Sequence, residues 1–338
     1  MIHRLAWTAL ICVIVLVFVG AIVRVTGSGL GCPDWPTCWG CLIPPTSADQ
    51  IDVTKLDLEK FKRHAARKGI DPDSITRETI LESFDPVHTW IEFVNRLTSL
   101  PLGLASLLLA LFSFRAKKHR GWVIGLSWFS LFDVLGNAVM GAMVVRSGLQ
   151  PGIITLHMAL AFLLIAVLVT VIWLTRPEPS FVKSAPLGSS KLLVVSWVFF
   201  ACLFGEGLMA SQVREQTDEL QKAVATASES NERASWSEEL GKTLVYKVHR
   251  SFSWVLLITA ILIFRWRGQL QQPAREPTLI LGFIVAMMLM GVVMAHIAVF
   301  QAVQVLHVGS TAVLLAIAWH WLVRLMAANR SKELIATN

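Results

Sequence analysis

The chain has 338 residues, of which 54% are hydrophobic, and a formal net charge of +7. This apolar content excludes an ordinary soluble domain and indicates a protein that crosses a membrane several times. The positive charge does not indicate nucleic-acid binding, because the basic residues follow the ends of apolar segments and do not form one basic face.

Eight apolar segments each come close to the roughly 20 residues that cross a bilayer as a helix. In chain order they are residues 5–25, 91–114, 122–145, 153–174, 192–210, 244–264, 278–296 and 302–325. The alternating pattern of membrane-spanning strands does not occur in the sequence, so we predict an all-α membrane protein with eight transmembrane helices.

The distribution of basic residues predicts the orientation. Lys and Arg are concentrated at both chain ends and in the connections 115–120, 176–191 and 265–275. By the positive-inside rule these parts lie in the cytoplasm, together with both termini. The two long connections, 26–87 and 211–243, are then expected on the outer side. The second of them is acidic and is expected to form a solvated helical segment.

The first long connection contains Cys32, Cys38 and Cys41. On the oxidising outer side two cysteines normally form a disulfide, and a zinc site has no evident fourth ligand here. We choose Cys32 with Cys38 as the pair, which leaves Cys41 unpaired. Two short helices, near residues 57–68 and 73–84, are expected in the rest of the connection, which we interpret as a lid or a docking insertion.

The segment that opens the second transmembrane helix carries His88, Glu92 and Asn95. At about 100° per residue, offsets of four and seven place these residues on one helical face. Polar groups that share a face of a membrane helix point into the bundle, and a carboxylate there needs a partner or a chemical task. Glu92 is therefore a candidate functional residue.

An internal repeat relates the first four helices to the last four. Gly141 precedes His157 by sixteen residues, and Gly291 precedes His307 by the same interval. The repeat predicts two pseudo-symmetric four-helix bundles of parallel topology. The predicted halves are residues 1–175 and 190–326.

The repeat also superposes Asn95-Arg96 on His249-Arg250, and the comparison indicates that the halves are not equivalent. The second half has a histidine pair and no carboxylate beside it, as expected for a bound electron-transfer heme. The first half has Glu92 next to Asn95, as expected for a site that performs chemistry. A carboxylate in low-dielectric surroundings can act as a base or stabilise a developing cation.

Two histidines on different helices of a bundle can hold an iron porphyrin between them, and His249 and His307 meet this requirement. The propionate groups of a heme need cations, and Arg250 adjoins one of the two candidate ligands. Arg24 and Arg96 are expected at the same outer level, although the charge rule disfavours arginine there. This pattern predicts heme sites toward the outer side of the membrane.

Together these motifs closely resemble those of the heme A synthase family. The matching segments are residues 20–36, 91–96, 141–157, His249-Arg250 and His307. The resemblance covers nearly the whole chain and implies that one four-helix half holds heme b while the other converts heme O to heme A. That conversion oxidises the C8 methyl group of heme O to a formyl group for cytochrome oxidase assembly.

The resemblance also implies roles for individual residues. By it, His249 and His307 ligate heme b, Glu92 is the catalytic carboxylate, His157 lies at the substrate heme, and Cys32 with Cys38 form the thiol pair of the outer loop. It further implies a multi-pass protein of the cell membrane that works with heme O synthase and an electron acceptor, and it leaves a homo-oligomer open.

One position departs from the pattern of the family. The usual motif in the second helix is Glu-x-x-His-Arg, whereas this sequence has Asn95 at the histidine position. Asparagine is a poor heme ligand. Three interpretations stay open: His157 alone holds the substrate heme, His88 supplies a second ligand from two helical turns away, or the activity is altered or lost.

Two other functions fit the same pattern. One is a di-heme b-type membrane protein that only transfers electrons, and the other is a non-catalytic heme carrier in oxidase assembly. Glu92 discriminates between these functions and the enzyme, because electron transfer does not require a carboxylate and oxidation of a methyl group has a use for one. A transporter fits least, because the repeats are parallel and not inverted.

Overall fold

The computed structural model describes residues 1–67, 71–177, 190–227, 238–267, 274–297 and 299–336. Eight helices in these ranges are long and apolar enough to cross a membrane, and the described residues contain no strand. They are α1 (Ile2–Val25), α4 (Pro86–Ser113), α5 (Arg120–Arg146), α6 (Pro151–Thr175), α7 (Ser190–Ala227), α9 (Leu244–Trp266), α10 (Glu276–His296) and α11 (Gln301–Ala336). The prediction of an all-α protein with eight membrane spans is confirmed.

Most helices extend beyond the apolar segments that predicted them. The clearest case is α7, which continues past residue 210, where the apolar segment ends, to Ala227. Residues 211–227 contain several Gln, Glu and Ala residues, which favour the helical backbone although the segment as a whole is polar. Apolarity therefore located the membrane part of α7 but not its end. The continuation of the predicted acidic segment over residues 228–237 lies outside the described residues.

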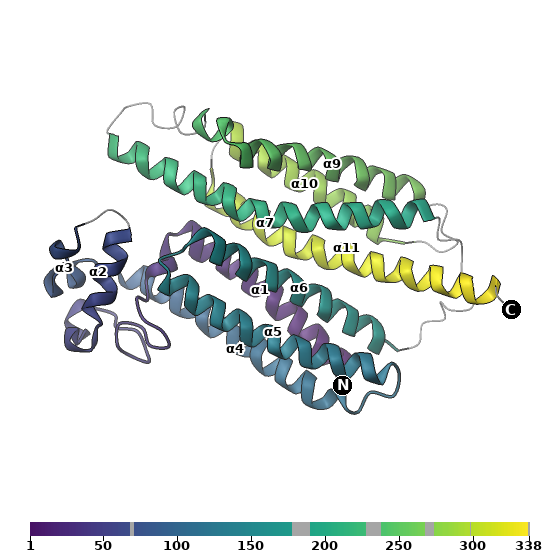
Figure 1. Cartoon of the computed structure of the whole chain (residues 1–338), viewed down its shortest axis with the longest axis horizontal. Coiled ribbons are helices and arrows are strands. Elements are labelled where there is room, and N and C mark those ends of the chain that lie inside the picture. Colours follow the sequence, from purple (N-terminus) through teal and green to yellow (C-terminus); the bar gives the residue numbers. More distant parts are fainter. Residues whose placement is uncertain (68–70, 178–189, 228–237, 268–273, 298, 337–338) are drawn as a thin grey trace.

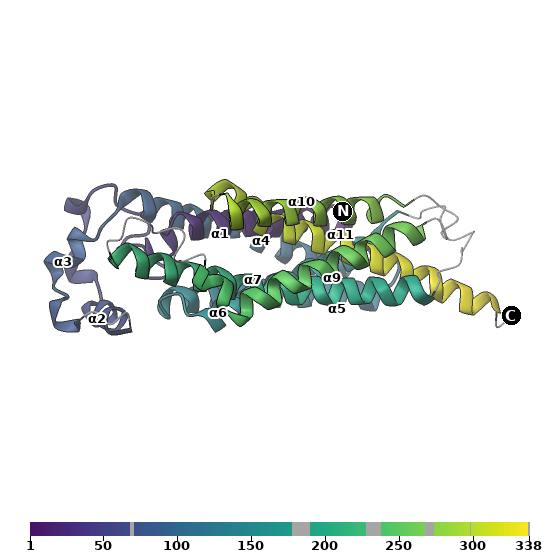
Figure 2. The same cartoon turned by 90° about the horizontal axis from the view of Figure 1, so that it is seen from above.

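The eight long helices form two groups of four (Figures 1 and 2). In the first group, α1 and α5 each pack against both α4 and α6. In the second group, α7 and α10 each pack against both α9 and α11. Helices α4 and α6 thus occupy opposite corners of the first group, as α9 and α11 do in the second. The chain order around both groups is the same, which agrees with the expected repeat; pseudo-symmetry stays a prediction.

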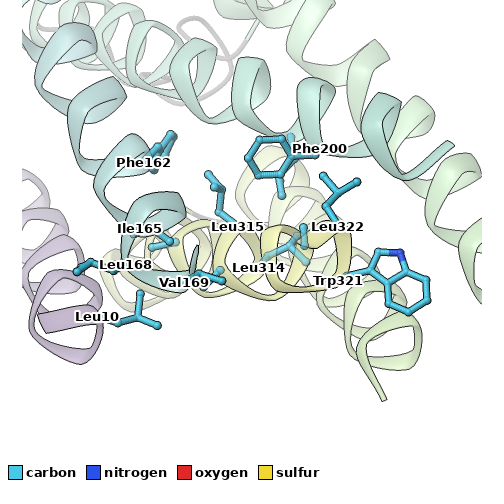
Figure 3. Packing of buried hydrophobic residues seen from close by; sticks show 14 of the residues in the cluster. Leu10, Phe162, Ile165, Leu168, Val169, Phe200, Leu314, Leu315, Trp321 and Leu322 are labelled. Atoms are coloured by element: carbon cyan, nitrogen blue, oxygen red, sulfur yellow. The ribbon is translucent and has the colours of Figure 1, made fainter. Parts of the chain in front are cut away.

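The two groups join where α1 and α6 meet α11 and where α6 meets α7. Figure 3 shows part of this core, in which Phe162 of α6, Phe200 of α7 and Leu315 of α11 are buried. Trp321 is also buried, and its indole N–H donates a hydrogen bond to Ser196 Oγ at 2.9 Å. Because lipid tails are as apolar as these side chains, close packing and such hydrogen bonds hold membrane helices together.

Gly309 lies where α11 meets α1. A Cβ atom at this position would lie 2.1 Å from the ring of Phe18. We expect Gly309→Ala to lower the free energy of unfolding by about 1–3 kcal/mol, because overpacking displaces the ring. The measurement is the unfolding temperature in detergent. Gly282→Ala in α10 is the matched control, because a Cβ atom there meets nothing within 4 Å. Equal stability of the two variants would contradict this contact between the groups.

The connection between α1 and α4 folds into a small unit beyond one end of the first group, which we name the loop end (Figures 1 and 2). It contains α2 (Leu58–Arg67) and α3 (Arg77–Glu82), close to the two short helices that were expected. Cys32 and Cys38 form the predicted disulfide, and Cys41 is free. The buried core of the unit consists of Cys32, Cys38, Trp39, Ile51 and Ile80. The N-terminus and the last turn of α11 lie at the opposite end of the molecule (Figure 1). Their cytoplasmic location stays a prediction.

Helix α4 begins at the edge of this unit, and the carboxylate of Asp85 caps its N-terminus. Asp85 Oδ1 accepts hydrogen bonds from the amides of Val87 at 2.8 Å and His88 at 3.0 Å, and Pro86 follows at the first helical position. The hydrogen bond from the His88 amide is the main cause that lowers the pKa of Asp85. A lowered pKa means that the ionised cap stabilises the folded state fully above the ordinary value of about 4 and that this stabilisation is lost as the pH falls through the lowered value.

Asp85→Ala tests the cap. We expect the amides of Val87 and His88 to exchange hydrogen faster in the variant at neutral pH, because they lose their acceptor. After correction for the intrinsic rate, the difference should shrink only below about pH 4, where the unsubstituted carboxyl becomes protonated. Asp49→Ala, which removes an exposed carboxylate of the same unit, is the control. Unchanged exchange in Asp85→Ala would show that this cap does not hold the start of α4.

Candidate functional site

Two histidines of the second group come from helices at opposite corners. His249 lies in the second turn of α9 and His307 in the second turn of α11, both near the loop end. The two imidazoles are close enough to interact electrostatically. Nδ1 of each ring is buried and makes no hydrogen bond among the described residues. Two imidazoles from helices at opposite corners of a bundle suit the binding of a porphyrin iron between them.

The same residues are less suited to coordinating a metal ion without a porphyrin. Within the described ranges no three His, Cys, Asp or Glu side chains gather closely enough to hold one. Two imidazoles are the number that a porphyrin iron takes from the protein, because the macrocycle supplies its other four ligands. The donor set therefore fits a heme.

The structure corrects the expectation that no carboxylate lies beside this histidine pair. Glu206 of α7 is only 7% exposed, and its Oε1 lies 3.0 Å from His249 Nδ1. The same oxygen accepts a hydrogen bond from Ser253 Oγ at 3.1 Å. This contact could not be predicted from the sequence, because the spacing of two helices along the chain does not tell which of their faces meet. The only indication in the sequence was that Glu206 is a carboxylate inside an apolar segment, where such a residue is usually paired or functional.

Glu92 of α4 has both a partner and a structural task in the first group. It is 3% exposed, and its Oε1 lies 2.5 Å from Arg96 Nη2. Its Oε2 accepts a hydrogen bond from the backbone amide of Cys32 at 2.7 Å. The carboxylate thus joins α4 to the chain at the disulfide, and the Arg96 guanidinium balances its charge.

Arg96 extends this attachment along the disulfide loop. Its guanidinium donates to the carbonyl oxygens of Asp34 at 2.8 Å and of Cys32 and Thr37 at 3.0 Å. The sequence pattern made Arg96 a candidate cofactor-binding residue at the outer level of the heme sites. In the structure the Arg96 guanidinium contacts Glu92 and the disulfide loop, and we name this set of contacts the Glu92–Arg96 clamp.

His157 of α6 occupies the corner opposite α4. Its Nδ1 is buried without a hydrogen-bond partner among the described residues, and its ring adjoins the main chain of Asn137. In the second half, the ring of His307 adjoins the main chain of Met287. Asn137 and Met287 each lie twenty residues before the histidine that they contact. The two halves thus present α6 and α11 histidines in similar surroundings.

The remaining predicted residues differ in their exposure. Asn95 is half-buried on α4, whereas the side chain of His88 is 44% exposed and lies 3.7 Å from Asp85. Arg24 lies in the last turn of α1, and Arg250 is exposed next to His249 in α9. The end of α1 and the start of α9 both lie at the loop end (Figure 1). That this level is the outer one stays a prediction.

Sequence analysis also missed a second buried acid. Asp133 lies in the middle of α5 and is 7% exposed. Asn137 Nδ2 donates to its carboxylate and to its main-chain carbonyl, both at 3.2 Å. Asp133 is thereby connected through Asn137 to the surroundings of His157. An acid within an apolar segment was again the available signal.

The fold defines a helical membrane protein with eight candidate membrane spans, and its second group holds a pair of histidines on different helices. Residues 3–319 match the family described as cytochrome oxidase assembly proteins (COX15-CtaA), and the chain belongs to this family. The resemblance that the motifs predicted is therefore confirmed at the level of the family.

Individual relatives carry the name heme A synthase. The protein of Shewanella oneidensis is 27% identical over 201 residues, which are 57% of this chain and 54% of the relative. That of Methylobacterium radiotolerans is 31% identical over 209 residues, which are 59% of this chain and 53% of the relative. That of Nitrosomonas eutropha is 27% identical over 208 residues, or 59% and 55% of the two chains. Each match spans about half the length of the relative.

Proposed function

We propose that this protein is a heme A synthase, which oxidises the C8 methyl group of heme O to the formyl group of heme A. Membership of the family and the name of its relatives support heme A synthesis. The observation that carries the site assignment is the placement of a buried carboxylate, Glu92, and a half-buried histidine, His157, at opposite corners of the first bundle.

In this proposal the first bundle receives heme O as substrate. His157 would bind its iron, because this half-buried imidazole lies on the helix opposite Glu92 and its Nδ1 makes no hydrogen bond among the described residues. His88 is the weaker candidate, since it is half-exposed and lies beside Asp85. Glu92 stabilises positive charge that develops at the reacting carbon or accepts a proton from it. The Glu92–Arg96 clamp fixes the position of that carboxylate.

The second bundle holds heme b in this proposal. His249 and His307 would hold its iron, and Arg250 would pair with one of its propionate groups. A bis-imidazole heme accepts and donates single electrons. The contacts of α6 with α7 and α11 join the two bundles, so a heme held in the second would supply single-electron chemistry next to the first.

The cellular setting belongs to the same proposal. The positive-inside rule places both termini in the cytoplasm and the loop end outside the cell membrane. Heme O synthase would supply the substrate, and an electron acceptor would reoxidise heme b. The small unit with α2 and α3 is exposed at the loop end, where such a partner can reach it (Figure 1).

A non-catalytic heme carrier is the second candidate, and Asn95 favours it. The family motif has a histidine at this position, and Glu92 is already engaged by Arg96 and Cys32. A protein that binds heme O without oxidising it would have these features. A di-heme electron-transfer protein is less well supported, because α4 offers Asn95 opposite His157 where a second axial histidine would be required.

Extraction of the hemes distinguishes the two candidates. The protein is expressed in cells that make heme O and no other heme A synthase, and its hemes are separated by chromatography. We expect heme A together with heme B, because the clamp and His157 provide a complete substrate site. Heme B with only unmodified heme O would overturn the enzyme and favour the carrier. A protein that retains no heme would overturn both.

A further inference from the structure

Glu206 is a buried acid in a helix that crosses the membrane, and it lies beside a histidine that is a candidate heme ligand. Its Oε1 lies 3.0 Å from His249 Nδ1. We propose that Glu206 is a positioning residue for His249: it accepts the Nδ1–H of the imidazole and thereby fixes the ring with Nε2 directed to the heme iron. This inference rests on the heme b site of the proposed function.

The surroundings of Glu206 leave His249 as its main partner. Among the described Lys and Arg residues none forms an ion pair with this carboxylate. Ser253 Oγ donates to Oε1, and Oε2 makes no hydrogen bond within the described ranges. A carboxylate buried in an apolar helix is unfavourable unless it is paired or serves a function. The contact with His249 provides both a pair and a function.

The geometry leaves room for a stronger contact. The distance is that of a hydrogen bond, but the His249 ring is not oriented for one, because its Nδ1 satisfies no hydrogen-bond geometry. We expect the ring to turn toward Oε1 when Nε2 binds iron. His249 Nδ1 would then be satisfied, as the outer nitrogen of a ligating histidine usually is.

A carboxylate in this position changes the ligand as well as orienting it. Accepting the Nδ1–H fixes the tautomer and raises the basicity of the imidazole at the iron-binding nitrogen. A more basic ligand stabilises ferric over ferrous iron, so Glu206 should lower the reduction potential of the heme. No described carboxylate lies within ion-pair distance of His307, whereas Glu206 lies 3.0 Å from His249 Nδ1. The two axial ligands of heme b would therefore be inequivalent.

The opposite end of the second group offers a matched pair. Glu276 of α10 lies 3.2 Å from His320 Nδ1 and is also largely buried. It differs in a second contact, an ion pair with Arg324 at 3.0 Å. Both pairs join a buried carboxylate to a histidine Nδ1, but only Glu206 contacts a candidate heme ligand. Glu276→Gln therefore controls for the general effect of removing a buried charge.

The test compares Glu206→Gln, Glu206→Leu and Glu276→Gln in the full-length purified protein. The readouts are the heme b content, the midpoint potential of the low-spin heme and its ferric electron paramagnetic resonance spectrum. Glutamine keeps an acceptor but removes the charge, so Glu206→Gln should retain heme, raise the midpoint potential and shift the ferric spectrum toward that of two neutral imidazoles. Leucine removes the acceptor as well and should also reduce heme retention, by about 10–100-fold in affinity. Glu276→Gln should change none of the three.

Two results would overturn the inference. Potentials and spectra that are unchanged in both Glu206 variants, with heme retained, would show that Glu206 does not act on His249 and would leave the heme b site intact. An unsubstituted protein without any low-spin heme would overturn this inference and the proposed heme b site together.

Discussion

His307→Ala is expected to remove the low-spin heme from the second bundle. Losing a contact beside a ligating histidine commonly weakens binding by 10–100-fold, so loss of the ligand itself should exceed about 100-fold. The variant should fold, because His307 Nδ1 makes no hydrogen bond among the described residues, so its removal leaves no buried polar group without a partner. The measurement is the low-spin spectrum and heme b content of the purified protein.

His249→Ala should remove the same heme but with an additional loss of stability. Deleting this imidazole leaves the carboxylate of Glu206 buried with only Ser253 as a hydrogen-bond donor. An uncompensated buried charge typically destabilises a protein by about 3–5 kcal/mol. Combining His249→Ala with Glu206→Ala should therefore restore folding without restoring heme.

His320→Ala is the control for both variants, since it lies on α11 at the end away from the loop unit. Its partner Glu276 keeps the ion pair with Arg324, so the variant leaves no buried charge unpaired. If the low-spin spectrum of His307→Ala equals that of the unsubstituted protein, His307 is not a heme ligand.

The sequence contained enough information to predict the fold. Each span was recognisable from its apolar run alone, because an isolated stretch of about 20 apolar residues has few alternatives to a membrane helix. The disulfide of Cys32 with Cys38 was also predicted correctly. What the pattern could not provide were the polar continuations of the helices, such as residues 211–227 of α7, whose stability comes from backbone propensity.

The candidate site was only partly predictable. Histidine spacing and the repeat identified His157, His249 and His307, since these depend on positions within one helix or its repeat. The contacts of Glu206 and Arg96 depend on which faces of distant segments meet, and periodicity along one segment does not contain that information. Arg96 is an example, because the acceptors of its hydrogen bonds are loop carbonyl oxygens, and no sequence motif predicts these contacts.

Glu92→Gln is expected to lower heme A formation by about 10²–10⁴-fold, the usual range for a positioned acid–base group. Glutamine has the same shape and keeps an oxygen that can accept from the Cys32 amide, which now lies 2.7 Å from Glu92 Oε2. It removes the negative charge and with it the ion pair to Arg96. The ratio of heme A to heme O is the measurement, and the low-spin heme b spectrum should be unchanged. Normal product formation would contradict a chemical role for this carboxylate.

Loss of activity in Glu92→Gln could also arise from a loosened loop, and Arg96→Gln separates the two causes. This variant removes the three hydrogen bonds to loop carbonyl oxygens but leaves the Glu92 carboxylate in place. The rate at which a reductant opens the buried Cys32–Cys38 disulfide reports on the loop. If the clamp is mainly structural, Arg96→Gln should speed reduction and lower heme A formation as much as Glu92→Gln does. If the carboxylate acts on the substrate, Glu92→Gln should stop product formation while the disulfide stays protected, because Arg96 still holds the loop.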